Sequence, residues 1–306
     1  MTIWNKIRTE FSDSQHKNIR LKYLRQYSRY TNRNIIIYYS DFLSSSKPAF
    51  LTMLDEEDKH IIGDVVKELD PQKGLDVLIE SPGGSPDAAE AIANMLRLKF
   101  SSVRFIVPNM AKSAATVLCL SGDEILMNEQ SELGPIDPQM GFKHPNGNLI
   151  YSPAHLIIQQ FTTLVQNAIE NQEFAKVLAP YLDMYFPSFL QECWNAIEHM
   201  KNISAELLFN YMFKRDPEKK ELAKDIAHKL SNFPQFLSHG RPLNIEYIKE
   251  LGLNVFDLRD DTRLNNIVLY LYFSIKETFN RNQAIYKLIE NNKGHGTVKH
   301  VTIKST

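Results

Sequence analysis

The sequence predicts an α/β protein with a largely parallel sheet, and three observations support this class. Short apolar runs typical of buried strands, at residues 75–79, 103–107 and 123–127, alternate with segments of helical periodicity. The first two runs each lead into a helix through a short turn, as in βαβ units with right-handed crossovers. The chain has 306 residues, of which 43% are hydrophobic, so it is long enough to bury one substantial core.

The individual elements follow from residue type and spacing. Residues 34–39 are β-branched and aromatic, as in a strand, whereas acidic residues from position 55 precede apolar positions at helical spacing. Pro86 suits the first turn of a helix, and Gly252 suits a helix C-terminus. Strands are therefore expected at 34–39, 75–79, 103–107 and 123–127, and helices at 55–69, 86–99, 113–121, 153–177, 188–200, 204–213, 218–231, 243–251 and 261–291.

The composition excludes several functional classes. A formal net charge of −1 without a basic stripe argues against a nucleic-acid-binding protein. The N-terminus is charged where a secretory signal would need its apolar core, and no run is long and apolar enough to span a bilayer, so a cytoplasmic location is expected. Cys119 and Cys193 are too few for a disulfide framework or a zinc site and fit a core. No metal or nucleotide motif is present, so no metal or other cofactor is expected.

Two turns carry the strongest functional signal. Glu80-Ser-Pro-Gly-Gly-Ser-Pro86 and Met110-Ala-Lys-Ser-Ala-Ala-Thr116 each follow a predicted strand and lead into an alanine-rich helix. Because the carboxyl ends of parallel strands meet at one sheet edge, the two turns are expected to lie together there. A glycine pair with free N–H groups beside a serine hydroxyl is what an acyl-transfer site requires. The alternative for Ser113 is a plain helix N-cap.

Four motifs in a fixed order carry a family resemblance. They are Ser81 to Pro86, Ala111 to Ala115, Gly134 to Gln139, and the late His-Gly-Arg-Pro and Leu-Gly-Leu-Asn-Val segments between His239 and Val255. Together they resemble the Clp protease/crotonase superfamily, and most closely its serine dehydrogenase proteinases, a branch similar to signal-peptide peptidases. The resemblance covers residues 34–257.

The resemblance implies a spiral of ββα units with helical C-terminal additions and a serine nucleophile. Ser113 matches the nucleophile position, and the oxyanion hole would be built from backbone amides of Gly83, Gly84 and Ala114. The domain division that follows is an N-terminal helical arm at 1–33, a Clp/crotonase-like peptidase domain at 34–257 with a helical insertion or cap at 153–231, and a C-terminal helix with a polar tail at 258–306. The arm is expected to be loosely docked, and peripheral membrane contact is the alternative.

The general base is less clearly marked. In Clp proteases a histidine follows the nucleophile's helix, but the matching position here holds Asp137. His239 falls near the place of the acidic triad member, so Asp137 could orient His239 in a Ser-His-Asp set of unusual chain order. Signal-peptide peptidases use a downstream lysine instead, for which Lys143 and Lys176 are the alternatives. The remaining histidines, including His155, carry no motif and are predicted to be structural.

Three functions follow from these residues. The first is a serine-type endopeptidase that cleaves peptide or protein substrates laid along the sheet edge. The alternatives are a catalytically inactive Clp-like scaffold and a crotonase-like acyl-thioester enzyme, which would need a thioester pocket and no nucleophile. The resemblance also implies a homo-oligomer, and any ATPase partner would be encoded by another gene. The expected location is cytoplasmic, with membrane association through the arm as the alternative.

Overall fold

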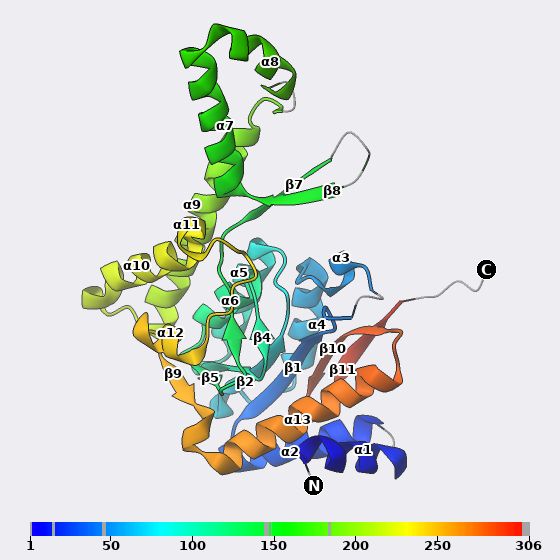
Figure 1. The fold of residues 1–306 in the computed structure, drawn as a ribbon. Helices are drawn as coiled ribbons and strands as arrows, with labels where there is room; N and C mark the ends of the chain where they lie inside the picture. Colours follow the sequence, from blue (N-terminus) through cyan, green and yellow to red (C-terminus); the bar gives the residue numbers. More distant parts are fainter. Residues whose placement is uncertain are drawn as a thin grey trace, which may run out of the picture.

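The computed structural model describes residues 2–13, 16–44, 47–143, 147, 149–182 and 185–301, and a seven-stranded sheet crosses its centre (Figure 1). The strand order is β11-β10-β1-β2-β3-β5-β9, in which β1, β2, β3, β5 and β9 run parallel, while β10 pairs antiparallel with both β1 and β11. The bounds are β1 Asn34–Ser40, β2 Leu75–Glu80, β3 Val103–Val107, β5 Glu124–Met127, β9 Val255–Asp257, β10 Ile285–Asn291 and β11 Gly296–His300. The predicted α/β class with a largely parallel sheet is confirmed.

Helices cover both faces of this sheet. The α-helices are α1 Ile3–Asp13, α2 His16–Thr31, α3 Ala49–Thr52, α4 Glu56–Val66, α5 Pro86–Lys99, α6 Ala114–Leu120, α7 Ala154–Glu170, α8 Gln172–Leu182, α9 Phe189–Leu207, α10 Lys220–Ser231, α11 Phe233–Phe236, α12 Ile245–Glu250 and α13 Thr262–Arg281. Short 3₁₀ or π turns occur at Pro71–Lys73, Leu208–Met212, Pro217–Lys219 and Leu258–Asp260. No helix among the described residues is long and apolar enough to cross a membrane.

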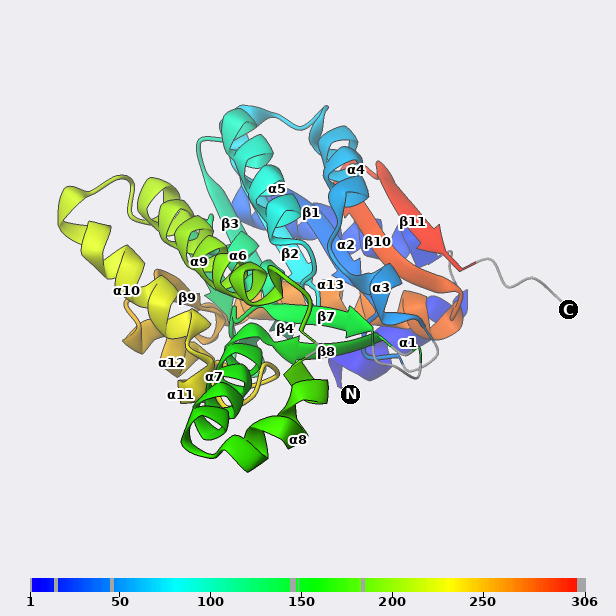
Figure 2. The same ribbon diagram turned by 90° about the horizontal axis from the view of Figure 1, so that it is seen from above.

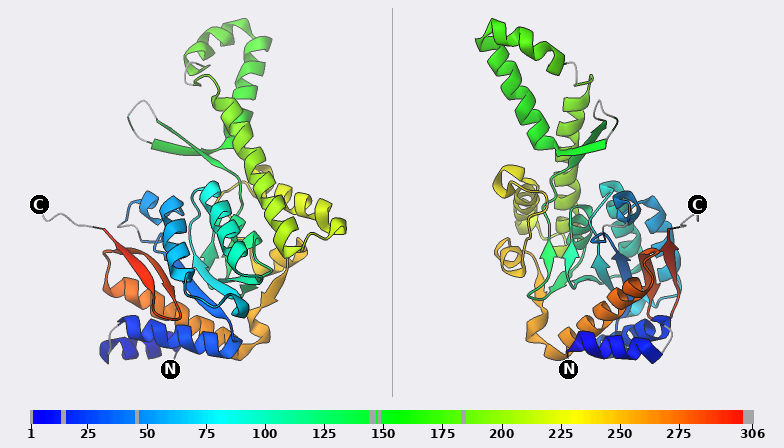
Figure 3. Two further views of the ribbon diagram at one scale, coloured as in Figure 1. Left: turned by 180° about the vertical axis from the view of Figure 1, so that it is seen from behind. Right: turned by 45° about the vertical axis from the view of Figure 1, so that its right-hand side comes forward.

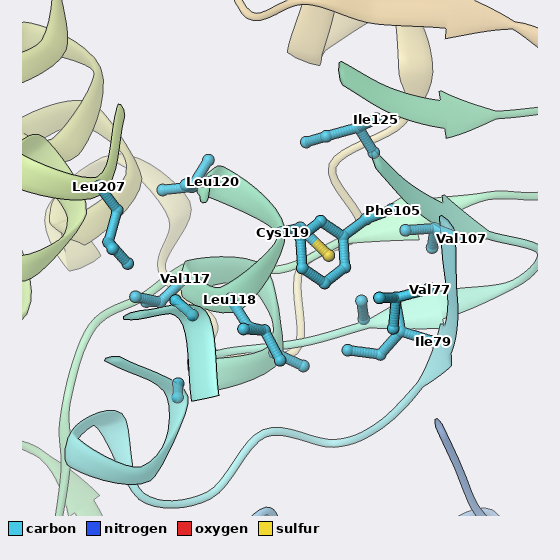
Figure 4. Close-up of a cluster of buried hydrophobic side chains, with 14 of the residues drawn as sticks. Val77, Ile79, Phe105, Val107, Val117, Leu118, Cys119, Leu120, Ile125 and Leu207 are labelled. Atoms are coloured by element: carbon cyan, nitrogen blue, oxygen red, sulfur yellow. The ribbon is translucent and has the colours of Figure 1, made fainter. Parts of the chain in front are cut away.

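Alternating side chains of the strands build two cores. In β1, Ile36 and Tyr38 join the core beneath α4, α5 and α6, whereas Ile35 and Ile37 join the core shared with α1, α2 and α13. Helix α5 lies between α4 and α9 on the first face (Figure 2). Around α6, the core side chains interlock closely, with Cys119 between the helix and Phe105 of β3 (Figure 4). Both cysteines are buried and free, as their apolar surroundings in the sequence predict.

A helical extension projects from the first face. Helices α7, α8 and α9 and the hairpin of β7 Gln139–Lys143 with β8 Leu149–Pro153 rise above the sheet (Figure 3). The single helix predicted for 153–177 is wrong at its C-terminal end. Asn171 is extended, and its side chain accepts the Glu173 N–H at 3.0 Å, so α7 ends and α8 begins there. The helices predicted at 188–200 and 204–213 are instead one helix, α9, followed by a π turn.

The two termini differ from their predictions. The helical arm at 1–33 is packed rather than loosely docked, because Ile7, Tyr27 and other side chains of α1 and α2 are buried against α13. The helix predicted for 261–291 ends at Arg281, and the polar tail of 258–306 is in part sheet. There β10 pairs with β1, and β11 pairs with β10. The C-terminal segment is therefore part of the central sheet, and the predicted boundary at 257 does not separate it from the sheet.

Candidate active site

The glycine turn and the serine turn lie side by side at the carboxyl edge of the sheet. The Ser81 N–H donates to the Met110 carbonyl at 3.1 Å, and the Lys112 N–H donates to the Ser81 carbonyl at 3.0 Å. A Cβ placed at Gly83 would lie 2.7 Å from the Ser113 Cβ and 2.9 Å from the Ala114 nitrogen. The φ of Gly83 is +95°, which residues with a side chain rarely adopt. Glycine is therefore required here both by the backbone conformation and by the closeness of Ser113.

Ser113 adopts a strained backbone conformation. Its φ of 51° and ψ of −122° are rare for a residue with a side chain and cost about 1–3 kcal/mol. An N-cap normally has β-region backbone and accepts a bond from the helix, but the Ser113 hydroxyl makes no capping bond. Within the described part of the chain, this half-buried hydroxyl has no hydrogen-bond partner. The plain N-cap interpretation is therefore wrong, and strain of this kind is typical of functional positions.

Two backbone amides beside the hydroxyl are available as donors. The N–H groups of Gly84 and Ala114 make no hydrogen bond to any residue that the structure describes. Ala114 is the first residue of α6, where a helix leaves its N–H groups unpaired. The Gly83 N–H, by contrast, donates to Ser81 Oγ at 3.2 Å. Of the three residues predicted for the oxyanion hole, Gly84 and Ala114 present free donors, and Gly83 provides the close approach between the turns.

Two further segments, residues 132–137 and 238–243, continue this edge of the sheet beyond the serine turn. The short strand β4, Met110–Ala111, pairs with β6, Glu132–Leu133, in parallel. Leu133 and Leu243 exchange two backbone hydrogen bonds of 3.0 Å in an antiparallel bridge. The Thr116 hydroxyl donates to the carbonyl of Gly134 at 3.1 Å and accepts its N–H at 3.0 Å. Residues 134–137 therefore run beside the serine turn, and residues 238–243 run beside them.

The structure brings Asp137 and His239 together across these two segments. They stand four residues beyond Leu133 and four before Leu243, as antiparallel pairing requires. His239 Nδ1 lies 2.9 Å from Asp137 Oδ1, and Gln139 Nε2 donates to the other carboxylate oxygen at 2.9 Å. The Asp137 side chain is fully buried, whereas His239 is 29% exposed. Neither side chain is hydrogen-bonded to Ser113 in this substrate-free structure.

The lysine alternatives are placed differently. Lys176 lies on α8 near the far end of the helical extension, 74% exposed and paired with Glu173 at 2.9 Å (Figure 1). The backbone of Lys143 belongs to β7, and its side chain lies outside the described residues. Lys112, next to the nucleophile, donates to Glu132 at 2.7 Å and to the Leu133 carbonyl at 3.1 Å, which directs its ammonium along β6.

One histidine near this site carries no sequence signal. His155, at the start of α7, has a buried Nε2 atom without a partner among the described residues. Burial lowers the pKa of His155 and Lys201 lowers it further, while the nearby Asp137 carboxylate acts in the opposite direction. With Phe233 and Leu237 it lines a groove of about 400 Å³. From the sequence, His155 was predicted to be a surface or satisfied core residue because it belongs to no motif, and its proximity to Asp137 arises only in the fold.

Comparisons with known proteins identify the family of the chain. A profile of the family described as ClpP-like SDH-type serine proteinase matches residues 4–171. Two uncharacterized proteins of Methanocaldococcus jannaschii are similar. MJ0137 is 28% identical over 238 residues (77% of this chain, 73% of that protein), and MJ1495 is 27% identical over 209 residues (67% and 59%).

Solved structures with a similar fold include two proteases. A mutant of the 1510-N membrane-bound stomatin-specific protease shares 16% identity and a TM-score of 0.41, covering 69% of this chain and 78% of that one. A ClpP1 mutant from Listeria monocytogenes shares 13% identity and a TM-score of 0.38, covering 76% and 96%. The family profile spans more than half of the 306 residues. The chain belongs to the ClpP-like SDH-type serine proteinases.

Proposed function

We propose that the chain is a serine endopeptidase whose nucleophile is Ser113. The observation that supports this most strongly is the strained Ser113, whose hydroxyl is unpaired and which closely approaches Gly83, while the N–H groups of the next residues in the two turns, Gly84 and Ala114, are free. Such a backbone holds a side chain in one orientation before substrate arrives, as a nucleophile requires. A serine that serves only to cap a helix would not need this cost.

The proposed reaction gives each part of the site one role. The Ser113 oxygen attacks the substrate carbonyl carbon as its proton passes to His239 Nε2, and the carbonyl oxygen becomes an oxyanion. Gly84 and Ala114 donate to that oxyanion, and one such donor contributes about 10²–10³-fold to kcat. His239 then gives the proton to the leaving amine as the C–N bond breaks, and water hydrolyses the acyl-enzyme with the same proton transfers.

Asp137 supports the proposed role of His239. Its contact with Nδ1 places the ring proton on that nitrogen, so Nε2 is left as the acceptor. The side chain of Asp137 is buried and bonded to Gln139 as well, which fixes the ring orientation. The missing hydrogen bond between His239 and Ser113 is compatible with this role, because such bonds often form only in the substrate complex.

A fluorophosphonate probe and a peptidase assay test this function together. Mass spectrometry should find the probe on Ser113 of the parent and on no residue of Ser113→Ala, while Ser101→Ala, at an exposed serine, should react like the parent. His239→Gln and Asp137→Asn should each lower kcat at least about 10³-fold with unchanged circular dichroism. A folded parent without label would instead favour the inactive scaffold, and parental activity in Ser113→Ala would exclude Ser113 as the nucleophile.

A further inference from the structure

We propose that Lys287, in the C-terminal strand β10, is a positioning residue that holds Gly84 in place for the oxyanion hole. This inference rests on the proposed function and extends it to a residue outside the catalytic turns. Lys287 acts through the segment of residues 53–55, which we call the linker segment, and each link in that path is a short hydrogen bond. The path starts at the glycine turn.

Leu54 of the linker segment is the neighbour that defines the glycine turn on its outer side. The Leu54 N–H donates to the Gly83 carbonyl at 2.8 Å, and the Ser85 N–H donates to the Leu54 carbonyl at 2.9 Å. These bonds flank Gly84, whose Cβ, if present, would stand 2.3 Å from the Leu54 oxygen. Gly84 therefore has one position relative to Leu54, and the direction of its free N–H follows from it.

The linker segment is in turn held on both sides of Leu54 by one pair of buried side chains. Lys287 Nζ donates to the carbonyl of Met53 at 2.8 Å, and the N–H of Asp55 donates to Asp58 Oδ2 at 3.1 Å. Lys287 Nζ also donates to the same Asp58 oxygen at 2.7 Å. Lys287 and Asp58 thus form a clamp whose two ends grip the residues before and after Leu54.

The clamp itself is rigid because of its burial. The side chains of Lys287 and Asp58 are both fully buried, and the Tyr38 hydroxyl donates to Asp58 at 2.7 Å. The backbone of Lys287 is paired with Ser40 in the central sheet, so the lysine is anchored at both ends. A buried lysine and aspartate would pair with each other in any structural role, but the third contact, to Met53, connects this pair to the site.

The catalytic consequence follows from what an oxyanion donor does. Its hydrogen bond strengthens as charge develops on the carbonyl oxygen, so a displaced donor lowers kcat more than it changes KM. Without the Lys287 ammonium, the Met53 carbonyl has no partner to hold it, and the linker segment can shift together with Gly84. A shift of about 1 Å in a catalytic group costs up to about 10²-fold in rate.

Lys287→Met tests the clamp, with Lys293→Met as the matched control. Lys293 lies in the turn between β10 and β11, and its ammonium bonds to the Glu68 carbonyl, away from the linker segment. We expect Lys287→Met to lower kcat and the rate of probe labelling at Ser113 about 10- to 100-fold, with KM within about twofold of the parent. We also expect faster amide hydrogen exchange in a peptide covering residues 81–88. The control should match the parent in both measurements.

The double variant Lys287→Met/Asp58→Asn separates positioning from stability, because it removes both charges of the buried pair, whereas in Lys287→Met the buried Asp58 carboxylate is left with the longer ion pair to Lys299 Nζ, at 3.3 Å. It should fold better than Lys287→Met yet keep the low kcat and the fast exchange of residues 81–88. Parental exchange of these residues in a folded Lys287 variant would overturn the proposal, and so would a fall in rate that appears only in KM. If the parent itself is not labelled at Ser113, the proposed peptidase function fails, while the exchange measurement still decides whether Lys287 holds Gly84.

Discussion

Glu80 joins the two turns of the site and should make the stability of the protein depend on pH. Its carboxylate is 1% exposed, and it accepts hydrogen bonds from Asn109 Nδ2 at 2.8 Å and from the Met110 N–H at 3.1 Å. Burial raises the pKa of Glu80 from its ordinary value of 4.5 to about 7, although both hydrogen bonds lower it. Ionisation of Glu80 therefore costs more free energy in the folded protein than in the unfolded chain.

The sign and size of the effect follow from this pKa. Because the folded-state pKa lies above the unfolded one, Glu80 contributes stability that is fully present below about pH 4.5. This contribution is lost as the pH rises to about 7. At 1.36 kcal/mol per pH unit, the whole rise in pKa corresponds to about 3 kcal/mol. About 2.5 kcal/mol of it is lost between pH 5 and pH 8.

Urea unfolding of Glu80→Gln at pH 5 and pH 8 measures this contribution. The variant keeps the shape of the side chain but does not titrate, so its free energy of unfolding should fall by about 2.5 kcal/mol less than that of the parent over this range. Glu250→Gln, at an exposed glutamate, should retain the parental pH dependence. Equal pH dependence in Glu80→Gln and the parent would show that Glu80 is not held at a raised pKa.

Two further substitutions test the backbone of the glycine turn and the buried ion pairs of Asp76 near the amino-terminal end of β2. Gly84→Ala places a methyl group against the Leu54 backbone at a φ of +150°. The free energy of unfolding, measured with urea, should therefore fall by at least about 2 kcal/mol, and probe labelling should be lost. Parental stability would contradict the contact with Leu54. Asp76→Asn removes the buried charge that pairs with Arg33 at 2.7 Å and with Arg104 at 2.8 Å. The free energy of unfolding should therefore fall by about 3 kcal/mol. A fall of less than about 1 kcal/mol would contradict a stabilising role for these ion pairs.

The sequence predicted the parts of the fold that depend on neighbouring residues. The parallel strands β1, β2, β3 and β5 were predicted because each is an apolar run bounded by turn residues. Strand β10 was predicted as the end of a helix because Ile285 continues the helical spacing that runs from Ile267 to Phe279, and a short apolar run does not distinguish helix from strand. Its pairing with β1 is a contact across more than 240 residues, which no local pattern contains.

The candidate site likewise has a part that local motifs predict and a part that only the tertiary fold creates. The Gly83-Gly84 pair and Ser113 stand in strand-to-helix turns, so their meeting at one sheet edge followed from the strand order. Lys287 and His155 carry no local motif, and the tertiary fold alone creates the hydrogen bond of Lys287 to Met53 and the electrostatic influence of Asp137 on His155. Asp137 and His239 were predicted as partners because each lies in a family motif. The distance of 2.9 Å between Asp137 Oδ1 and His239 Nδ1 was visible only in the structure.

The strain at Ser113 persists because its neighbours are fixed on both sides. The Lys112 N–H is bonded to Ser81, and the Thr116 hydroxyl is bonded to Gly134, so the turn between them has little freedom to relax. The hydroxyl and the two free amides are therefore held in fixed turns, whereas His239 is hydrogen-bonded to Asp137 and not to Ser113. Preorganised donors are usually the largest single contribution to this kind of catalysis. Lys287 acts on the segment that holds Gly84, one of the two proposed oxyanion donors. Its substitution should therefore lower kcat, although the proposed base, His239, lies on a different segment.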